Sequence, residues 1–421
     1  MIHRSNALTV LLVLILIATG AVLTGPQTAA AQPPGAPPFV RVQGTTLVSP
    51  DGKPLLLRGI NLGNWLVPEG YMFRLDSATS FRMINGLLSE LIGPAETHAF
   101  WKTFRERYIT RADIRYIKSI GLNSVRVPFS FRLFLSEEYY GIWTDDGFRY
   151  LDSVMAWCGS EGLLVILDMH CAPGGQTGDN IDDSWGYPWL FEDESEQERT
   201  VELWRRIAQR YARETCLVGY DLLNEPIAPF FDVERLNPRL EPLYKRIAAA
   251  IRSADTNHVV FLGGAQWNSN FKVFGQPFDA RAVYTFHRYW CDTTQALVQE
   301  FVDFRDRLQV PVWLGESGEN TDIWIDAFRR LLERNAIGWC FWPYKRMDAS
   351  RCIVTVARPA GWDVIRRYDH ARRTTYAGIR STRPDPAVVR KALEEYLRAI
   401  TFDACRPNAG YIAALGCAIP R

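Results

Sequence analysis

The sequence predicts an α/β protein, a (β/α)8 TIM barrel with an N-terminal hairpin and a C-terminal helical tail. The first observation is a series of eight short apolar segments that alternate with helical patterns, which is typical of parallel strands closed into a barrel. The second is that polar residues directly follow several of these segments, as at the functional mouth of such barrels. The third is the length of 421 residues, which suits one barrel with long loops and terminal additions. Open doubly wound sheets also alternate, but they seldom reach eight repeats, and no glycine-rich phosphate loop follows the first segment.

The predicted strands and helices alternate along the chain. The strands are residues 56–61, 123–128, 163–169, 218–223, 259–262, 282–286, 310–316 and 338–342. The helices are 100–120 with a restart at 110–113, 146–160, 196–212, 242–253, 297–308 and 323–334. Residues 40–57 predict a hairpin that covers one end of the fold. Asp385 and Pro386 are a favourable N-cap and first position for a last helix to about Ala399.

The N-terminus has the pattern of a secretory signal peptide. His3 and Arg4 precede an apolar run over residues 7–23, and the small residues at 28–31 predict cleavage near Ala31. A retained single-pass anchor is the alternative. We therefore expect residues 1–31 to be the signal peptide of a secreted, extracellular protein, and 32–38 to be a Pro-rich linker. The barrel domain would span 39–400, with 401–421 as a tail packed on it.

Eight cysteines are scattered singly, without the close pairs of a zinc site. Export would permit disulfides, and Cys405 and Cys417 are near enough in sequence to pair. Free buried thiols are an equal alternative, so the sequence leaves the pairing open.

The charge balance excludes some classes of partner. The chain has 48 Lys and Arg against 47 Asp and Glu, so we expect no nucleic acid and no membrane beyond the signal peptide as partner. The 14 Trp residues suit a cleft in which sugar faces stack on indole rings. We expect a monomer that binds a β-linked polysaccharide, oligosaccharide or glycoside.

Two strand ends carry a glutamate. The segment 218–223 ends in Asn224-Glu225-Pro226, and the segment 310–316 ends in Glu316. Pro226 cannot donate to a ladder, and it predicts an extended backbone at Glu225. Either carboxylate alone could be structural, held in an ion pair. Together they match what glycoside hydrolysis requires, an acid for the leaving oxygen and a carboxylate on the other side of the sugar carbon.

Other polar or aromatic residues also follow strands. They are Arg126, His170, His287 with Tyr289, and Trp342. Each has a purely structural interpretation, as a salt bridge, a core histidine or packing. Their position at the carboxyl ends of successive strands predicts a functional site instead.

With these motifs in order, the sequence resembles glycoside hydrolase family 5, the retaining, cellulase-like family with catalytic glutamates on strands four and seven. The matching pieces are Arg-Gly-Ile-Asn-Leu-Gly-Asn-Trp (58–65), Val-Arg-Val-Pro (125–128), Asp-Met-His (168–170), Asn-Glu-Pro (224–226), His-Arg-Tyr (287–289), Gly-Glu (315–316) and Phe-Trp (341–342). They span essentially the whole barrel, and as an ordered set they are specific.

The resemblance implies roles for individual residues. Glu225 would be the acid/base and Glu316 the nucleophile, with carboxyl groups ~5–5.5 Å apart, and Asn224 would hold the sugar 2-hydroxyl. Arg126 and Tyr289 would flank Glu316, and a guanidinium beside it would favour its ionised form. The remaining substrate-binding residues are expected to be His170, His287, Trp342 as the floor of the −1 subsite, and Trp65.

Residues 61–67 and 169–176 look like the branch of exo-β-1,3-glucanases and glycolipid-directed β-glucosidases. The chain departs from that branch at Cys171 and in the long loop 177–195, which carries Trp185, Tyr187 and Trp189. These departures leave the exo or endo mode open.

The sequence thus predicts a secreted retaining β-glycosidase acting on a β-glucan or related β-glucoside, with no metal or cofactor. A β-mannanase or glycolipid β-glucosidase on the same machinery is the nearest alternative, and a catalytically silent carbohydrate-binding barrel is an alternative of another class. A metal-dependent hydrolase using Asp168, His170 and Cys171 is disfavoured, because we do not expect residues 168 and 170 to converge.

Overall fold

The computed structural model describes residues 38–420. The predicted signal peptide, 1–31, and all but the last residue of the predicted linker, 32–38, lie outside this range. Of the helices in the described range, none combines the length and the apolar character that a membrane span requires.

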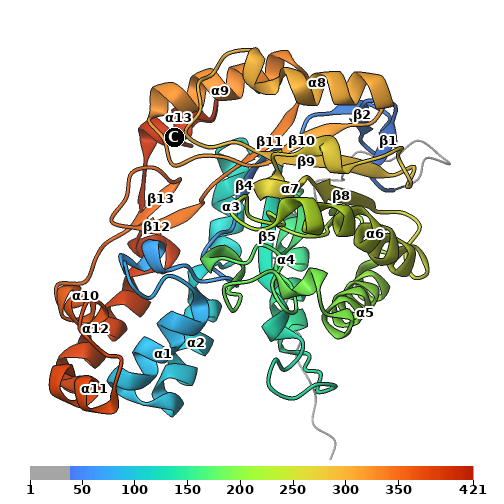
Figure 1. Ribbon diagram of the computed structural model, residues 1–421. Helices are drawn as coiled ribbons and strands as arrows, with labels where there is room; N and C mark the ends of the chain where they lie inside the picture. Colours follow the sequence, from blue (N-terminus) through green and yellow to red (C-terminus); the bar gives the residue numbers. More distant parts are fainter. Residues whose placement is uncertain (1–37, 421) are drawn as a thin grey trace, which may run out of the picture.

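Eight parallel strands form a closed barrel at the centre of the molecule (Figure 1), which confirms the predicted fold class. They are β4 (Arg58–Asn61), β5 (Ser124–Ser130), β6 (Leu164–Cys171), β7 (Leu217–Asp221), β8 (Val259–Gly263), β9 (Ala282–His287), β10 (Val312–Glu316) and β11 (Gly338–Phe341). Sequence neighbours pair in space, and β11 closes the ring by pairing with β4. Because both faces of these strands are buried, they read as continuous apolar runs, which made them predictable.

Helices surround the barrel on most crossovers. They are α1 (Phe81–Ile92), α2 (Pro94–Tyr108), α3 (Arg111–Ser119), α4 (Asp146–Glu161), α5 (Glu194–Tyr211), α6 (Val233–Arg252), α8 (Ala296–Leu308) and α9 (Asp322–Arg334). The crossover from β8 to β9 instead contains only the four-residue α7 (Ala265–Asn268) and a single 3-10 turn.

Several helices differ from the sequence prediction. Three that were not predicted lie after the barrel: α10 (Trp362–Asp369), α11 (Tyr376–Thr382) and α13 (Ala409–Ala414). Two of the helices around the barrel differ most. The helix α1 was not predicted at all. The helix α6 begins at Val233 rather than at Pro242, so that Pro238 and Pro242 lie inside it. Each proline removes one backbone hydrogen bond, but the helix buries an apolar face that includes Leu236 and Leu240. Burial of this apolar face therefore outweighs the low helix propensity of the two prolines.

A small antiparallel sheet closes the amino-terminal end of the barrel. It consists of β1 (Arg41–Gln43), β2 (Thr46–Val48) and β3 (Pro54–Leu55). Its Leu47 packs with residues that point into the barrel, among them Val218 and Trp313. The predicted hairpin at 40–57 is thus part of a three-stranded cover for one end of the barrel.

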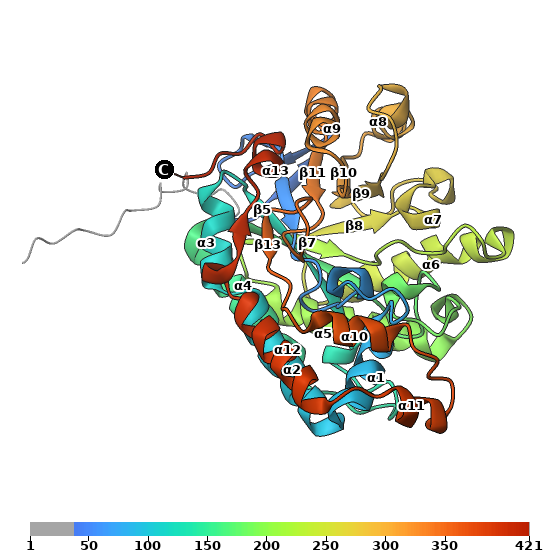
Figure 2. The same cartoon turned by 90° about the vertical axis from the view of Figure 1, so that its left-hand side faces the viewer.

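The chain after the barrel extends the fold beside its first helices. It forms β12 (Lys345–Met347), β13 (Val354–Val356), α10 (Trp362–Asp369), α11 (Tyr376–Thr382), α12 (Pro386–Ala399), β14 (Arg406–Pro407) and α13 (Ala409–Ala414). Figures 1 and 2 show α12 alongside α1 and α2, and Trp362 Nε1 donates to Phe73 O at 2.8 Å. The last helix of the chain, α13, lies against α9, where Arg329 Nε donates to Ala414 O.

All eight cysteines are free thiols in this structure, so Cys405 and Cys417 do not pair. The sequence had left this choice open.

Candidate active site

A cavity of about 660 Å³ opens at the carboxyl ends of the barrel strands. Most of the residues predicted for the site lie in its wall: His170, Glu225, His287, Tyr289, Glu316 and Trp342. Arg126 and Asn224 lie fully buried and are hydrogen-bonded to these lining residues. The topology therefore brings together residues that lie far apart in the chain, from Arg126 to Trp342.

Arg126, on β5, contacts side chains from four other strands of the barrel. Its Nε donates to Asp221 Oδ2 at 2.9 Å, and its Nη2 lies 3.0 Å from Asp168 Oδ1. Its Nη1 donates to Asn61 Oδ1 and to Glu316 Oε2, both at 3.0 Å. Burial raises the pKa of Asp168 and of Asp221 to about 7, and the guanidinium opposes that rise.

Glu316 ends β10 and accepts two hydrogen bonds. One comes from Arg126, and the other from the Tyr289 hydroxyl, which donates to Oε1 at 2.7 Å. Burial raises the pKa of Glu316, while the Arg126 guanidinium acts in the opposite direction. Both oxygens are thus oriented by donors, an arrangement that stabilises a carboxylate.

Glu225 does not have the predicted extended backbone. Its φ is 46°, in the left-handed region, and that of Ile227 is 57°. The loop after β6 holds this turn, because Gln176 Nε2 donates to Asn224 O and Thr177 Oγ1 donates to Glu225 O, both at 2.8 Å. These bonds offset a backbone conformation that costs on the order of 1–3 kcal/mol, and they outweigh the preference that Pro226 imposes.

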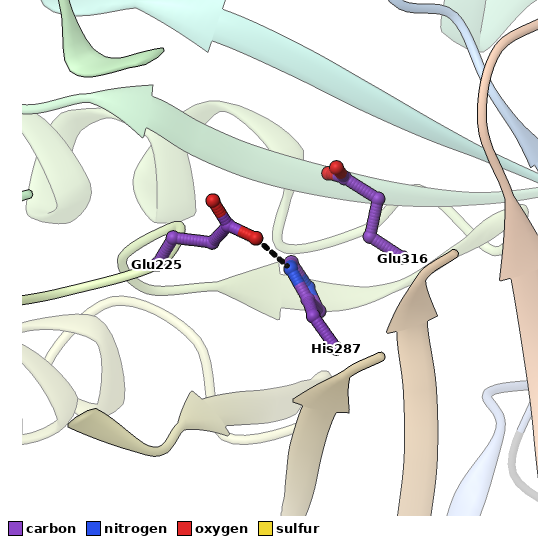
Figure 3. A group of neighbouring side chains, drawn as sticks. All are labelled: Glu225, His287 and Glu316. Carbon is purple, nitrogen blue, oxygen red and sulfur yellow. Dashed lines mark hydrogen bonds and ion pairs between the residues drawn. The ribbon is translucent and has the colours of Figure 1, made fainter. Parts of the chain in front are cut away.

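The Glu225 side chain reaches across to His287 and lies opposite Glu316 (Figure 3). His287 Nδ1 is 2.9 Å from Glu225 Oε1, and His287 Nε2 is 3.1 Å from Asn268 Nδ2. Burial lowers the pKa of His287 to about 3, so the imidazole ring is neutral. Because Asn268 Nδ2 donates to Nε2, the single ring proton of His287 is on Nδ1. Burial also raises the pKa of Glu225 to about 7.

His170 is fixed in a similar way on the other side of the cavity. Its Nδ1 lies 2.8 Å from Asp168 Oδ2, and its Nε2 lies 3.3 Å from Asn224 Nδ2. Burial lowers its pKa to about 4. Residues 168 and 170 do converge, against our expectation, because positions i and i+2 of a strand share a face. Asp168 is however also bound to Arg126, and Cys171 Sγ lies 3.8 Å from Ile181 O, away from this pair.

Trp342 covers one side of the cavity. Its ring stacks parallel to that of His170, with centroids 5.7 Å apart, and its Nε1 donates to the Tyr71 hydroxyl at 2.6 Å. Gly63 lies against the opposite part of the indole, where a Cβ would come within 2.5 Å of the ring. A glycine at 63 is therefore required for the indole to lie there.

Trp65 was predicted to bind substrate, but it is a core residue. It is 1% exposed, its Nε1 donates to Arg105 O, and its ring packs edge-on against Tyr150. Trp65 therefore stabilises the packing of the loop after β4, and its side chain lies outside the cavity.

Several lining residues were missed from the sequence. They are Glu69, Tyr71, Trp267, Trp290 and Glu319. Glu69 is 5% exposed, its Oε1 has no hydrogen-bond partner within the described range, and burial raises its pKa well above the usual value. Glu69 lies shortly after the 58–65 motif. That position was the only feature of the sequence that could have indicated a place in the cavity. Trp267 had no such feature, because it enters the cavity through three consecutive left-handed residues, 266–268.

Glu225, His287 and Glu316 also form the one group within residues 38–420 whose ligand atoms could hold a metal, all within 4.8 Å of one another. The group fits a cation poorly. Both oxygens of Glu316 already accept hydrogen bonds, His287 contacts Glu225 and Asn268 through its two nitrogens, and the Arg126 guanidinium lies 3.0 Å from Glu316.

The barrel with a pair of facing glutamates at its carboxyl end defines a class of enzyme, the glycoside hydrolases. Comparison with known proteins gives the family. A model of the family described as cellulase (glycosyl hydrolase family 5) matches residues 90–348, so the chain belongs to glycosyl hydrolase family 5.

Individual relatives carry several activities in their names. The chain is 30% identical over 344 residues to a beta-xylosidase of Phanerodontia chrysosporium, covering 73% of this chain and 71% of that one. It is 28% identical to endoglucanase C of Acetivibrio thermocellus (60% and 89% covered) and 29% identical to a glucan 1,3-beta-glucosidase of Lachancea kluyveri (58% and 58%). The fold is similar to that of a solved endogalactoceramidase, with a TM-score of 0.55, 20% identity and 74% and 75% covered.

Replacing Arg126 tests its role as the shared counter-charge of three buried carboxyl groups. We expect Arg126→Met to lower the free energy of unfolding by about 3–5 kcal/mol, because it leaves buried carboxylates unpaired. Their folded-state pKa values would rise further above the unfolded ones, and groups shifted in this direction lose stability as the pH rises. The loss should therefore be larger at pH 8 than at pH 5, measured by denaturant unfolding.

Arg149→Met, at an exposed arginine of α4, is the matched control and should change little. An equal loss at both pH values for Arg126→Met would contradict the proposed charge relation.

Proposed function

We propose that this glycoside hydrolase is a secreted, retaining enzyme that cleaves β-glucosidic bonds in a β-glucan or related β-glucoside by double displacement. The main support is the relation of the two glutamates, whose nearest carboxylate oxygens lie within 4.8 Å. Retaining enzymes separate their carboxyl groups by ~5–5.5 Å, whereas inverting enzymes leave about 6.5–9.5 Å for a water.

In the first step, a carboxylate oxygen of Glu316 attacks the anomeric carbon while Glu225 donates its proton to the departing glycosidic oxygen. The environments support this division. Burial keeps the pKa of Glu225 near 7, so it carries a proton over much of the acidic and neutral range. Arg126 and Tyr289 both donate to Glu316, which favours the ionised nucleophile. His287 occupies Glu225 Oε1, which leaves Oε2 for the proton; Figure 3 shows that oxygen pointing away from His287.

In the second step, Glu225 takes a proton from water as the water attacks the glycosyl-enzyme ester, and Glu316 leaves as a carboxylate. Once Glu316 is esterified, its negative charge is gone. The pKa of Glu225 then falls, because a neighbouring negative charge no longer opposes its ionisation. The same residue therefore changes from acid to base.

The family and its relatives support a β-glycan substrate without fixing the sugar. Relatives named glucan 1,3-beta-glucosidase and endoglucanase favour a β-glucoside, and the motifs at 61–67 agree with the first of these. The beta-xylosidase relative makes a β-xyloside the second candidate.

Alanine variants should separate the two glutamates. Glu316→Ala removes the nucleophile, so neither natural nor activated β-glycosides should turn over. Glu225→Ala leaves Glu316 able to attack a dinitrophenyl β-glucoside, whose leaving group needs no protonation. We expect a burst of dinitrophenol and then slow turnover, accelerated by azide with formation of the β-glycosyl azide. Stopped-flow absorbance and product NMR measure both.

A dinitrophenyl β-xyloside run in parallel distinguishes the two candidate sugars. If Glu316→Ala gave the burst and Glu225→Ala did not, the two roles would have to be exchanged.

The pH dependence of kcat/KM should follow the same assignment. For an oligosaccharide, whose leaving group needs a proton, kcat/KM should fall as the pH rises through about 7 and Glu225 deprotonates in the free enzyme. Activity should also fall on the acid side as Glu316 becomes protonated. In Glu225→Gln assayed with the dinitrophenyl glucoside, the alkaline fall should be absent. Its persistence in that variant would assign it to another group.

Export remains part of the proposal, supported by the apolar run at 7–23 and the alanines before Gln32. N-terminal sequencing of protein recovered from the culture medium should begin near Gln32. An intact N-terminus on membrane-bound protein would show a retained anchor instead.

A further inference from the structure

A second cavity, of about 760 Å³, lies outside the catalytic one. It is lined by residues from the loops after β5 and β6, the beginning of α1 and the beginning of α5. Three large aromatic side chains line it, and all are well exposed: Tyr140 (59%), Trp185 (67%) and Trp189 (47%). Exposed aromatic rings that share one hollow indicate a binding surface. We call this cavity the aromatic groove.

Trp185 is held rigidly although it is exposed. The Arg82 guanidinium lies over its ring at 3.5 Å, and its Nε1 donates to Glu137 Oε1 at 3.0 Å. Arg82 also binds Glu137 at 3.0 Å. One face of the indole is therefore covered and its edge is fixed, so its exposure comes from the opposite face.

The other two rings are supported in the same manner. The Arg199 guanidinium lies 4.3 Å from the Tyr140 ring, and the Tyr140 hydroxyl is hydrogen-bonded to Glu196. Trp189 packs against Tyr187, with centroids 4.8 Å apart. Each of the three residues has a cation or another ring beside it and still keeps roughly half to two thirds of its surface in solvent.

The loop that carries Trp185 is built around two buried aspartates. Asp182 accepts hydrogen bonds from the backbone N–H groups of Thr177 (2.6 Å) and Gly178 (2.9 Å). Asp183 accepts from the Arg82 backbone N–H at 2.8 Å and from Arg132 Nε at 2.9 Å. The platform is thus ordered before any ligand arrives, which lowers the entropic cost of binding.

The polar groups of the groove select a neutral ligand. Four carboxylates line it, from Glu137, Glu138, Asp193 and Glu196, against two arginines, Arg82 and Arg132. Both arginines are already paired with Glu137 and Asp183. An anionic ligand such as a nucleic acid would be repelled, whereas carboxylate oxygens accept hydrogen bonds from hydroxyl groups.

We propose that the aromatic groove is a second carbohydrate-binding site, which holds a stretch of β-linked glycan by stacking sugar faces on Trp185 and Trp189 while hydroxyls donate to the neighbouring carboxylates. This rests on the proposed function for the class of ligand. The loop after β6 also supplies Asn180 and Ile181 to the catalytic cavity. One segment therefore contributes to both sites, and the groove would keep a polysaccharide close to the catalytic centre.

The test uses the double variant Trp185→Ala/Trp189→Ala in the full chain. Native gel electrophoresis through soluble mixed-linkage β-1,3/1,4-glucan, and separately through soluble β-1,3-glucan, measures retention. We expect the wild type to be retarded in at least one gel. The double variant should bind about tenfold more weakly, a loss of about 1.4 kcal/mol, because both stacking rings are removed. Hydrolysis of an aryl β-glycoside should stay within about twofold, since neither Trp lines the catalytic cavity.

Tyr376→Ala is the matched control, an 82% exposed aromatic residue on α11, and should keep wild-type retention. Trp185→Phe should retain part of the binding, which distinguishes stacking from a general loss of structure. The proposal is overturned if the wild type is retarded in neither gel, if the double variant is retarded as strongly as the wild type, or if retention and aryl glycoside hydrolysis fall together. Absence of aryl glycoside hydrolysis in the wild type would instead count against the proposed function, and the gels would still report on the groove.

Discussion

The architecture of the site depends on one buried cation. The Arg126 guanidinium contacts side chains from β4, β6, β7 and β10, and its Nη2 also donates to Asn224 Oδ1 at 2.8 Å. A buried charge is tolerated only when it is fully paired, so these strands have to present polar atoms at one level of the barrel. The same contacts set the position of Glu316 and, through Asn224, the chain that leads to Glu225. The contacts that stabilise the barrel interior therefore also place the two facing glutamates.

Backbone strain lies at the same end of the barrel. Glu225, Ile227 and residues 266–268 all have positive φ, although none is a glycine. Hydrogen bonds from the loop after β6 hold the first pair, and Gln266 N donates to Ile227 O at 3.0 Å, which links the two strained segments. Such conformations persist when surrounding structure over-determines them. Here they direct Glu225 and Trp267 into the cavity, which regular strands ending at Asp221 and Gly263 would not do.

The sequence predicted most of the elements that depend on a hydrophobic pattern and missed the features that depend on local backbone geometry. All eight strands were found, because their buried apolar runs are continuous. The missed helix α1 did carry a signal, since Ile84, Leu87, Leu88 and Leu91 repeat at helical spacing after Ser80 and before Gly93. Trp65 was misjudged because a motif identifies a segment and not the direction of each side chain. Trp267 could not be found, since no propensity predicts three left-handed residues in succession.

The charged groups around the cavity affect both the protonation of Glu225 and the charge of a substrate that can bind there. Four glutamates line the cavity, at positions 69, 225, 316 and 319. Arg126 and Arg346 are bound to Glu316 and Glu319, and Arg288, which also lines the cavity, is paired with Glu300. Little positive charge therefore remains for Glu69 and Glu225. Burial raises the pKa of each of these glutamates, and the arginines around the cavity are already paired with carboxylates, so the site offers little attraction to an anionic sugar. A neutral glycan satisfies both conditions, because its hydroxyls donate hydrogen bonds to carboxylates and add no charge that would draw the proton away from Glu225.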